Sequence, residues 1–81
     1  MKKIKLMEGD LEETYLSELE HGDYVKVWNG KEKFWVMITA IKNNLTLYGI
    51  ISSRLKLSSY THGDIISFHT KHIFEYMKLF I

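Results

Sequence analysis

The sequence predicts a small domain of the mainly β or α+β class, in which one N-terminal helix precedes about five strands that form a small barrel. Three observations support this prediction: a helical stripe of apolar residues near the N-terminus, alternation of side chains from Tyr24 onward, and turn residues at short intervals. With 81 residues, the chain has room for one domain. We divide it into a basic segment (1–9), a helix (10–21) and the barrel (23–81).

The acidic segment from residue 10 to residue 21 is predicted to be helical. Asp10 is a suitable N-cap, and Glu13 three residues later completes a capping box. Gly22 provides a stop at the C-terminal end. The apolar residues of the segment fall on one stripe at helical spacing, namely Leu11, Tyr15, Leu16 and Leu19.

From Tyr24 onward the apolar period changes to two, which is typical of strands with one buried face. Asn29 and Gly30 are a strong hairpin signal, and Asn43 with Asn44 marks a second turn. The segments predicted to be strands are 24–28, 34–41, 45–51 and 65–69, and residues 73–81 fit either a strand or a helical turn.

One tripeptide precedes two of these strands: residues 21–23 and residues 62–64 both read His-Gly-Asp. Glycine permits a turn with positive φ, and aspartate can accept hydrogen bonds from nearby backbone amides. We therefore predict two equivalent turns at the entrances of two strands.

These segments, in this order, resemble the family known as domain of unknown function 2314. The similarity lies in Gly-Asp-Tyr-Val-Lys-Val (22–27), Phe-Trp-Val (34–36), Tyr-Gly-Ile-Ile (48–51), Gly-Asp-Ile-Ile-Ser-Phe (63–68) and Ile-Phe-Glu-Tyr (73–76). Where the family places an Asn and a Pro after the third strand, this chain has Ser-Ser-Arg-Leu. The resemblance implies a compact SH3-like β-barrel with an N-terminal helix, and it implies no reaction.

Composition narrows the classes of function. The chain has no cysteine, which excludes disulfides and thiolate metal sites. Its longest apolar run, residues 34–41, is less than half of the ~20 residues that cross a bilayer. We therefore expect a soluble cytoplasmic protein that does not enter membranes. Ten lysines to one arginine suggest an AT-rich genome and fit a viral origin, with the host cytoplasm or nucleus as the location.

The sharpest candidate site is the first predicted hairpin, where aromatic and basic side chains interleave on one face. A two-residue turn would set Lys26 opposite Lys33, whereas a four-residue turn over 29–32 sets Lys26 opposite Trp35 and avoids a like-charge pair. We favour the longer turn. Lysines can meet phosphates while aromatic rings stack on bases, so this face suits single-stranded nucleic acid. The candidate binding residues are Tyr24, Lys26, Trp28, Lys31 and Lys33, with Arg54 and Lys56 assisting.

Packing offers a simpler explanation of the same face, and we favour it. The face continues into Met37, Thr39 and Ile41, which look buried, and the helix stripe needs an apolar surface to cover. The helix would then pack on Trp35, Met37 and Ile41, leaving Trp28 and the lysines near the edge.

Other sites are less well supported by the spacing. An aromatic cage for a methylated lysine would recruit Tyr24, Trp28, Tyr48 and Tyr60. His62, His69 and His72, with Glu75 or Asp64, match no familiar zinc spacing, so ordinary histidines are expected. Phosphate loops and nucleophile elbows are absent from the sequence. We expect no enzyme, no cofactor, no metal and no small-molecule substrate.

Two functions follow as hypotheses. The first is an interaction module that binds a protein partner or a second copy of itself, since the C-terminal residues 78–81 are largely apolar where chain ends are usually polar. The alternative is single-stranded nucleic-acid binding through the aromatic and basic hairpin face.

Overall fold

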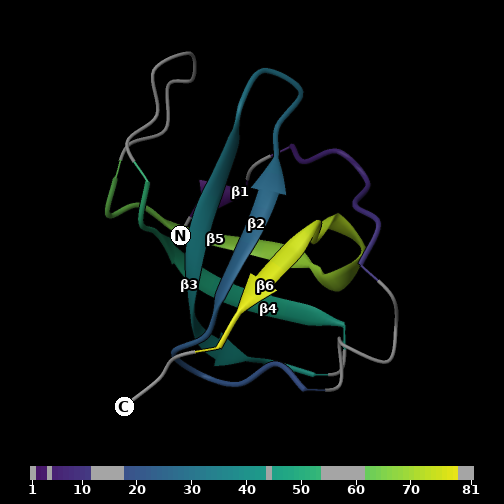
Figure 1. The fold of residues 1–81 in the computed structure, drawn as a ribbon. Helices are drawn as coiled ribbons and strands as arrows, with labels where there is room; N and C mark the ends of the chain where they lie inside the picture. Colours follow the sequence, from purple (N-terminus) through teal and green to yellow (C-terminus); the bar gives the residue numbers. More distant parts are fainter. Residues whose placement is uncertain (1, 4, 12–17, 44, 54–61, 79–81) are drawn as a thin grey trace.

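The structure is a computed structural model, and it describes residues 2–3, 5–11, 18–43, 45–53 and 62–78. The strands among these residues form one mixed sheet (Figure 1). The strands are β1 (Lys2–Lys3), β2 (Tyr24–Trp28), β3 (Lys33–Ile41), β4 (Thr46–Ile51), β5 (Ile65–His69) and β6 (Glu75–Met77), with a 3-10 turn η1 (Thr70–His72) after β5. The strand order is β1-β5-β4-β3-β2-β6. All neighbours are antiparallel except β1 and β5, which are parallel.

The four strands predicted from the period-two pattern are confirmed, with ends that differ by at most one residue. Within the open choice over residues 73–81, Glu75–Met77 form a strand, β6, on the free side of β2, and residues 79–81 lie outside the described residues. The sequence pattern did not reveal β1, which lies in the segment predicted only to be basic. Two residues are too few to show alternation, so this strand left no signal in the sequence.

Alternation along each strand separates a buried face from an outer face. Val25, Val27, Phe34, Val36 and Ile38 point inward from β2 and β3, and each is at most 1% exposed. The inward residues of β4 and β5 and several residues outside the strands complete one hydrophobic core, namely Leu47, Ile51, Ile66, Phe68, Leu6, Leu19 and Ile73. The outward residues of β2 and β4 are half-buried, so this face is neither core nor fully solvated.

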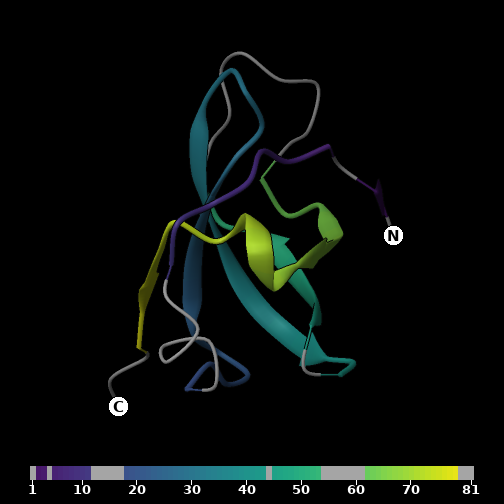
Figure 2. The same cartoon turned by 90° about the vertical axis from the view of Figure 1, so that its right-hand side faces the viewer.

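The sheet is bent so that the core lies on its concave side. β4 and β5 cross behind β2 and β3 in Figure 1, and Figure 2 shows the N-terminal segment and η1 lying across the open side of the bend. A register shift between Ile38 and Ala40 interrupts the pairing of β3 with β4, and such a bulge increases local bending. Main-chain bonds from Met7 to Trp28 and from Leu11 to Ile73 fix the N-terminal segment in place.

The helix predicted over 10–21 is not seen in the described residues. Residues 10, 11 and 18–21 are not helical, and residues 12–17 lie outside the described part of the chain. Leu11 donates its amide to the carbonyl of Ile73, as an extended segment beside η1 would. Gly22, which we interpreted as a helix stop, instead takes φ +95° in a turn before β2. The predicted bounds are therefore wrong, because helix propensity is a weak signal that tertiary contacts override.

The mainly β class is confirmed, and the described residues form one small sheet with the 3-10 turn η1 as their only helical element. β1 and β6 stand at the two edges of the strand order, and no pairing joins these two edges among the residues that the structure describes.

Candidate interaction surface

The outer face of the sheet carries a continuous row of apolar and aromatic side chains. In register, Met77 of β6 pairs with Tyr24 of β2, and Tyr24 pairs with Met37 of β3. Met37 then pairs with Ile50 of β4, and Ile50 pairs with Ile65 of β5. We call these five residues the outer row. It crosses every antiparallel strand of the sheet and contains no ionisable group apart from the tyrosine hydroxyl.

The outer row is accessible to solvent along its length. Its two end residues, Met77 and Ile65, are 49% and 47% exposed, and the three between them are half-buried. Scattered apolar residues are ordinary on a protein surface, whereas a contiguous apolar patch marks an interaction site. The outer row is therefore our candidate functional site. It belongs to the outer face of the sheet, whose bend places β4 and β5 behind β2 and β3 (Figures 1 and 2).

The predicted hairpin face adjoins the outer row, in the register that we favoured. Trp28 pairs with Lys33 and Lys26 pairs with Trp35, so residues 29–32 form a four-residue turn. The Asn29 side chain accepts hydrogen bonds from the amides of Lys31 and Glu32, which explains why asparagine suits the first turn position. The hairpin prediction is thus confirmed at the level of register.

Lys26 and Lys33, the two strand lysines of this face, already have partners inside the domain. The Lys26 ammonium lies 5.1 Å from the centroid of the Trp35 ring and 3.2 Å from a Glu75 carboxylate oxygen. The Lys33 ammonium lies 4.9 Å from the centroid of the Phe74 ring, and the rings of Phe74 and Trp28 form a T-shaped pair with their centroids 6.2 Å apart. The ammonium groups of both lysines therefore already contact aromatic rings of the same domain through cation–π interactions.

Glu75 is the group that sequence reasoning missed on this face. Along β2 and β3 no acid interrupts the lysines and aromatics, but β6 places Glu75 directly opposite Lys26. A nucleic acid that approached Lys26 would have to displace this carboxylate, and one that stacked on Trp35 would have to displace the ammonium above it. Local spacing cannot reveal a contact between residues 49 positions apart in the sequence.

The remaining predicted site residues are not gathered at this face by the described structure. Lys31 is exposed in the hairpin turn. Arg54, Lys56 and the cage candidate Tyr60 lie outside the described residues. Tyr24 and Trp28 share a face of β2, and Tyr48 lies two strands away on β4.

The predicted cover of this face by the acidic segment is wrong for the described residues. Leu19 is 7% exposed within the core cluster, and Leu11 packs against the same cluster, so both serve the inner face. Ile41, which we expected to be covered, is 45% exposed. Trp35 and Met37 are half-buried rather than core residues. For Leu11 and Leu19, the concave face supplies the apolar surface that the stripe needs.

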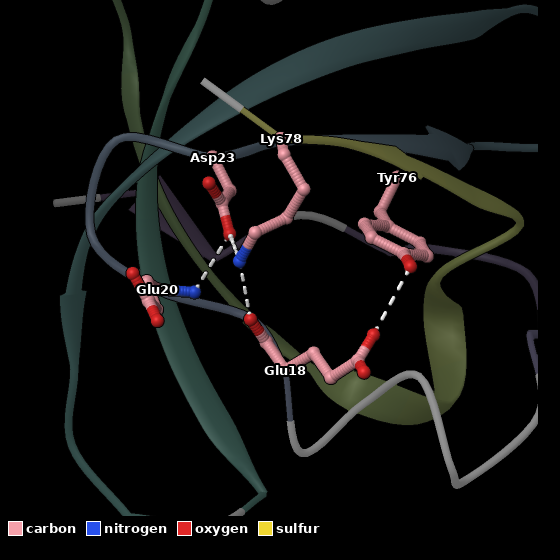
Figure 3. Close-up of polar contacts among 5 residues, drawn as sticks. All are labelled: Glu18, Glu20, Asp23, Tyr76 and Lys78. Atoms are coloured by element: carbon pink, nitrogen blue, oxygen red, sulfur yellow. Dashed lines mark hydrogen bonds and ion pairs between the residues drawn. The ribbon is translucent and has the colours of Figure 1, made fainter. Parts of the chain in front are cut away.

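A polar cluster fastens β6 to the start of β2 (Figure 3). Asp23 is 3% exposed, and its Oδ2 accepts hydrogen bonds from the Glu20 amide at 2.9 Å and from the Lys78 ammonium at 2.7 Å. Lys78 also donates to the Glu18 carbonyl, and the Tyr76 hydroxyl donates to the Glu18 carboxylate at 3.2 Å. The hydrogen bond with Asp23 raises the pKa of Lys78. The prediction that Asp23 caps a turn is confirmed, with an ion pair that the sequence did not indicate.

This cluster sets one end of the outer row. Lys78 follows Met77 directly and Asp23 precedes Tyr24 directly, so their ion pair holds β6 and β2 together where Met77 and Tyr24 pair. Lys78, which we had grouped with the apolar C-terminal residues as a contact with a partner, thus has an intramolecular role. Residues 79–81 lie outside the described part of the chain.

The two histidines near the end of β5 contact the main chain, His69 within η1 and His72 in the N-terminal segment. His69 Nδ1 accepts from the Lys71 amide at 2.9 Å, and His72 Nδ1 lies 3.1 Å from the Met7 carbonyl oxygen. Burial lowers the pKa of His72, which keeps its ring neutral near pH 7. Within the described ranges, no group of three or more His, Cys, Asp or Glu side chains is placed to hold a metal ion.

Comparisons with known proteins add no assignment. A scan against protein-family models and searches of curated proteins and of solved structures found no match to this chain. The resemblance to domain of unknown function 2314 therefore stays a prediction. In the part of the chain that the structure describes, no helix is both long and apolar enough to span a membrane.

Proposed function

We propose that this domain is a non-enzymatic protein-interaction module whose contact surface is the outer face of its sheet. The observation that supports the proposal is the outer row, five registered apolar or aromatic residues that leave two large side chains about half exposed. Burying such side chains against a partner is favourable by roughly 25 cal/mol per Å² of apolar area. The apolar side chains of the row form no hydrogen bonds with water, so contact with a partner explains why these positions are apolar.

A photo-crosslinking amino acid at position 65 tests this proposal, with position 41 as the matched control. Both positions are isoleucines in strands with nearly equal exposure, 47% and 45%, but only Ile65 belongs to the outer row. We expect covalent adducts with defined proteins, identified by mass spectrometry, from position 65 and few from position 41. Equal labelling at the two positions, or none at either, would contradict a contact surface on the outer face.

Single-stranded nucleic-acid binding is the second candidate, favoured by the shared face of Lys26, Trp28 and Lys33. The intramolecular contacts of these groups weaken the case, because a strand would have to break them before gaining its own contacts. Fluorescence anisotropy of a labelled oligonucleotide at low and moderate salt decides the question. Binding that falls steeply with salt would support this candidate, since counterion release sets that slope. We expect no measurable binding.

We further propose that the bent sheet is an SH3-like barrel, as the resemblance to domain of unknown function 2314 implies. The bend at the β3 bulge and the main-chain bonds from Met7 to Trp28 and from Gly9 to Lys71 support this proposal. Backbone nuclear Overhauser contacts between the N-terminal segment and β6 would test closure of the barrel. Their absence in solution would leave an open sheet.

A further inference from the structure

We infer that residues 5–11, which we call the strap, occupy a site for an extended peptide and can leave it while the sheet stays folded. A separate peptide with the chemistry of the strap, above all a glycine at the position of Gly9, then binds in its place. The strap lies on the core side of the sheet, so this inference goes beyond the function proposed for the outer row.

The strap is held as an added strand would be. Every second amide along it donates to a main-chain carbonyl, at distances between 2.7 and 3.1 Å. These bonds run from Met7 to Trp28, from Gly9 to Lys71 and from Leu11 to Ile73. A period of two is that of an extended chain, and main-chain bonds of this kind give affinity to peptides that extend a sheet. The three carbonyls therefore form an acceptor site for an extended segment.

The sheet does not depend on the strap for its strand pairing. The three carbonyls belong to the end of β2 and to the segment around η1, which lies beside the strap in Figure 2. These two parts are also joined directly, because β2 pairs with β6 and the Phe74 amide donates to the Lys26 carbonyl. All four antiparallel pairings, from β6 to β5, lie outside the strap. Loss of the strap therefore leaves these pairings intact.

Few side chains anchor the strap. Leu6 is 8% exposed within the core cluster, and Leu11 packs against that cluster. The other four side chains of the strap are exposed, namely those of Lys5, Met7, Glu8 and Asp10. Segments with few buried contacts open at a lower free energy than the strands of a core. We therefore expect the strap to open as one unit before the sheet unfolds.

Gly9 gives the site its selectivity. A Cβ at this position would overlap the main-chain carbonyl of Ile73 and would lie 2.8 Å from the carbonyl carbon of His72. Main-chain atoms cannot turn aside as the end of a side chain can, so this contact admits no side chain. Gly9 is not one of the glycines with positive φ, so the missing Cβ rather than backbone freedom explains the residue. A peptide that fits the site needs glycine here, with a large aliphatic residue three positions before it and another two positions after it.

In the wild type the strap competes with any added peptide. A segment tethered beside its own site has an effective concentration on the order of millimolar, which excludes a dilute competitor. Gly9→Ala removes this competition, because it prevents the strap from seating but changes none of the residues that supply the carbonyls. The substitution therefore converts an occupied site into an open one.

The decisive experiment measures the fluorescence anisotropy of a labelled peptide with the sequence of residues 5–11, titrated with full-length Gly9→Ala and with the full-length wild type. We expect the variant to bind at least about tenfold more tightly, because its own strap no longer competes. A peptide that itself carries the Gly9→Ala change should bind neither chain. Gly63→Ala is the matched control, since it adds the same methyl group away from the strap, and it should bind the peptide no better than the wild type does.

The variant can overturn the inference in two ways. A Gly9→Ala chain that loses the circular dichroism of the wild type would show that the sheet does not fold without a seated strap. A folded Gly9→Ala chain that binds the peptide no better than Gly63→Ala does would show that the vacated site takes no peptide.

Hydrogen exchange of the wild type tests the opening of the strap without any substitution. The amides of Met7, Gly9 and Leu11 should exchange at one common rate, at least about tenfold faster than the Ile38 amide, which bonds within the sheet. Exchange of all four amides at the same rate would show that the strap opens only with the whole fold, and would overturn the inference. The crosslinking experiment at position 65 probes the other face of the sheet, so failure of either proposal leaves the other in place.

Discussion

The two His-Gly-Asp turns have the same backbone conformation, but the first is more deeply buried than the second. Gly22 and Gly63 both take φ +95°. In the first turn the Gly22 amide donates to the Ile38 carbonyl, and the Ile38 amide donates to the Asp23 carbonyl. The second turn repeats this pair of bonds, with Gly63, Asp64 and Ile51 in the same roles. The prediction of two equivalent turns is therefore confirmed at the level of the main chain.

The side chains of the two turns differ because their neighbours differ. Asp23 is 3% exposed and bonds to Lys78, which arrives 55 residues later in the sequence. Asp64 is half-buried, and its glycine is exposed where Gly22 is buried. The same tripeptide thus determines the local path of the main chain at both turns, because glycine and aspartate act on adjacent backbone groups. What the aspartate does beyond the turn depends on which distant strand packs beside it.

The largest expected effect comes from Asp23→Ala. The substitution removes a buried carboxylate that accepts from Lys78 and from the Glu20 amide, and we expect the free energy of unfolding to fall by roughly 2–3 kcal/mol. Urea unfolding monitored by tryptophan fluorescence measures this loss. The matched variant Asp64→Ala changes a half-buried aspartate rather than a buried one, so we expect it to cost less than Asp23→Ala. Equal losses in the two variants would show that the aspartate serves the turn alone.

The next largest effect tests the positive φ that the glycines of both turns share. Among the described residues, a Cβ at position 63 would meet no atom within 4 Å, so Gly63→Ala tests the cost of positive φ without a clash with them. We expect a loss of about 1–2 kcal/mol in the free energy of unfolding. Gly63→Asn should cost less, because asparagine tolerates positive φ better than alanine. If alanine and asparagine are both neutral here, the shared backbone does not depend on glycine.

Much of the fold could be predicted from the sequence because it is recorded in local patterns. Alternation in 24–28 and 65–69 gave the two strands with the bounds that the structure has. Asn29 indicated the hairpin, and like-charge repulsion between Lys26 and Lys33 correctly favoured the four-residue turn. The helix predicted over 10–21 is not seen at residues 10, 11 and 18–21. Leu11 and Leu19 pack on the core without helical structure, which apolar residues at helical spacing also allow.

The candidate surface could be predicted only in part. Tyr24 and Trp35 were placed on one face by alternation, which a strand enforces without help from distant residues. The outer row needed the registers of β4, β5 and β6, which set Ile50, Ile65 and Met77 beside them. Such registers arise from pairing between segments tens of residues apart, and no local period encodes them.

The smallest expected effect is a loss of stability at alkaline pH. It comes from the titration of Lys78, which pairs with the aspartate of the first turn only. The hydrogen bond with Asp23 raises the pKa of Lys78 above 10.5, so the folded state holds this proton more tightly than the unfolded state does. Its contribution to stability is therefore complete below pH 10.5 and is lost as the pH rises through the raised pKa.

Urea midpoints measured from neutral to strongly alkaline pH should show Lys78→Met less stable than the wild type at first. The two proteins should then converge as the pH rises. A gap between Lys78→Met and the wild type that stays constant with pH would mean that Lys78 stabilises the fold through its aliphatic packing, and the contrast between the two turns would then not be electrostatic.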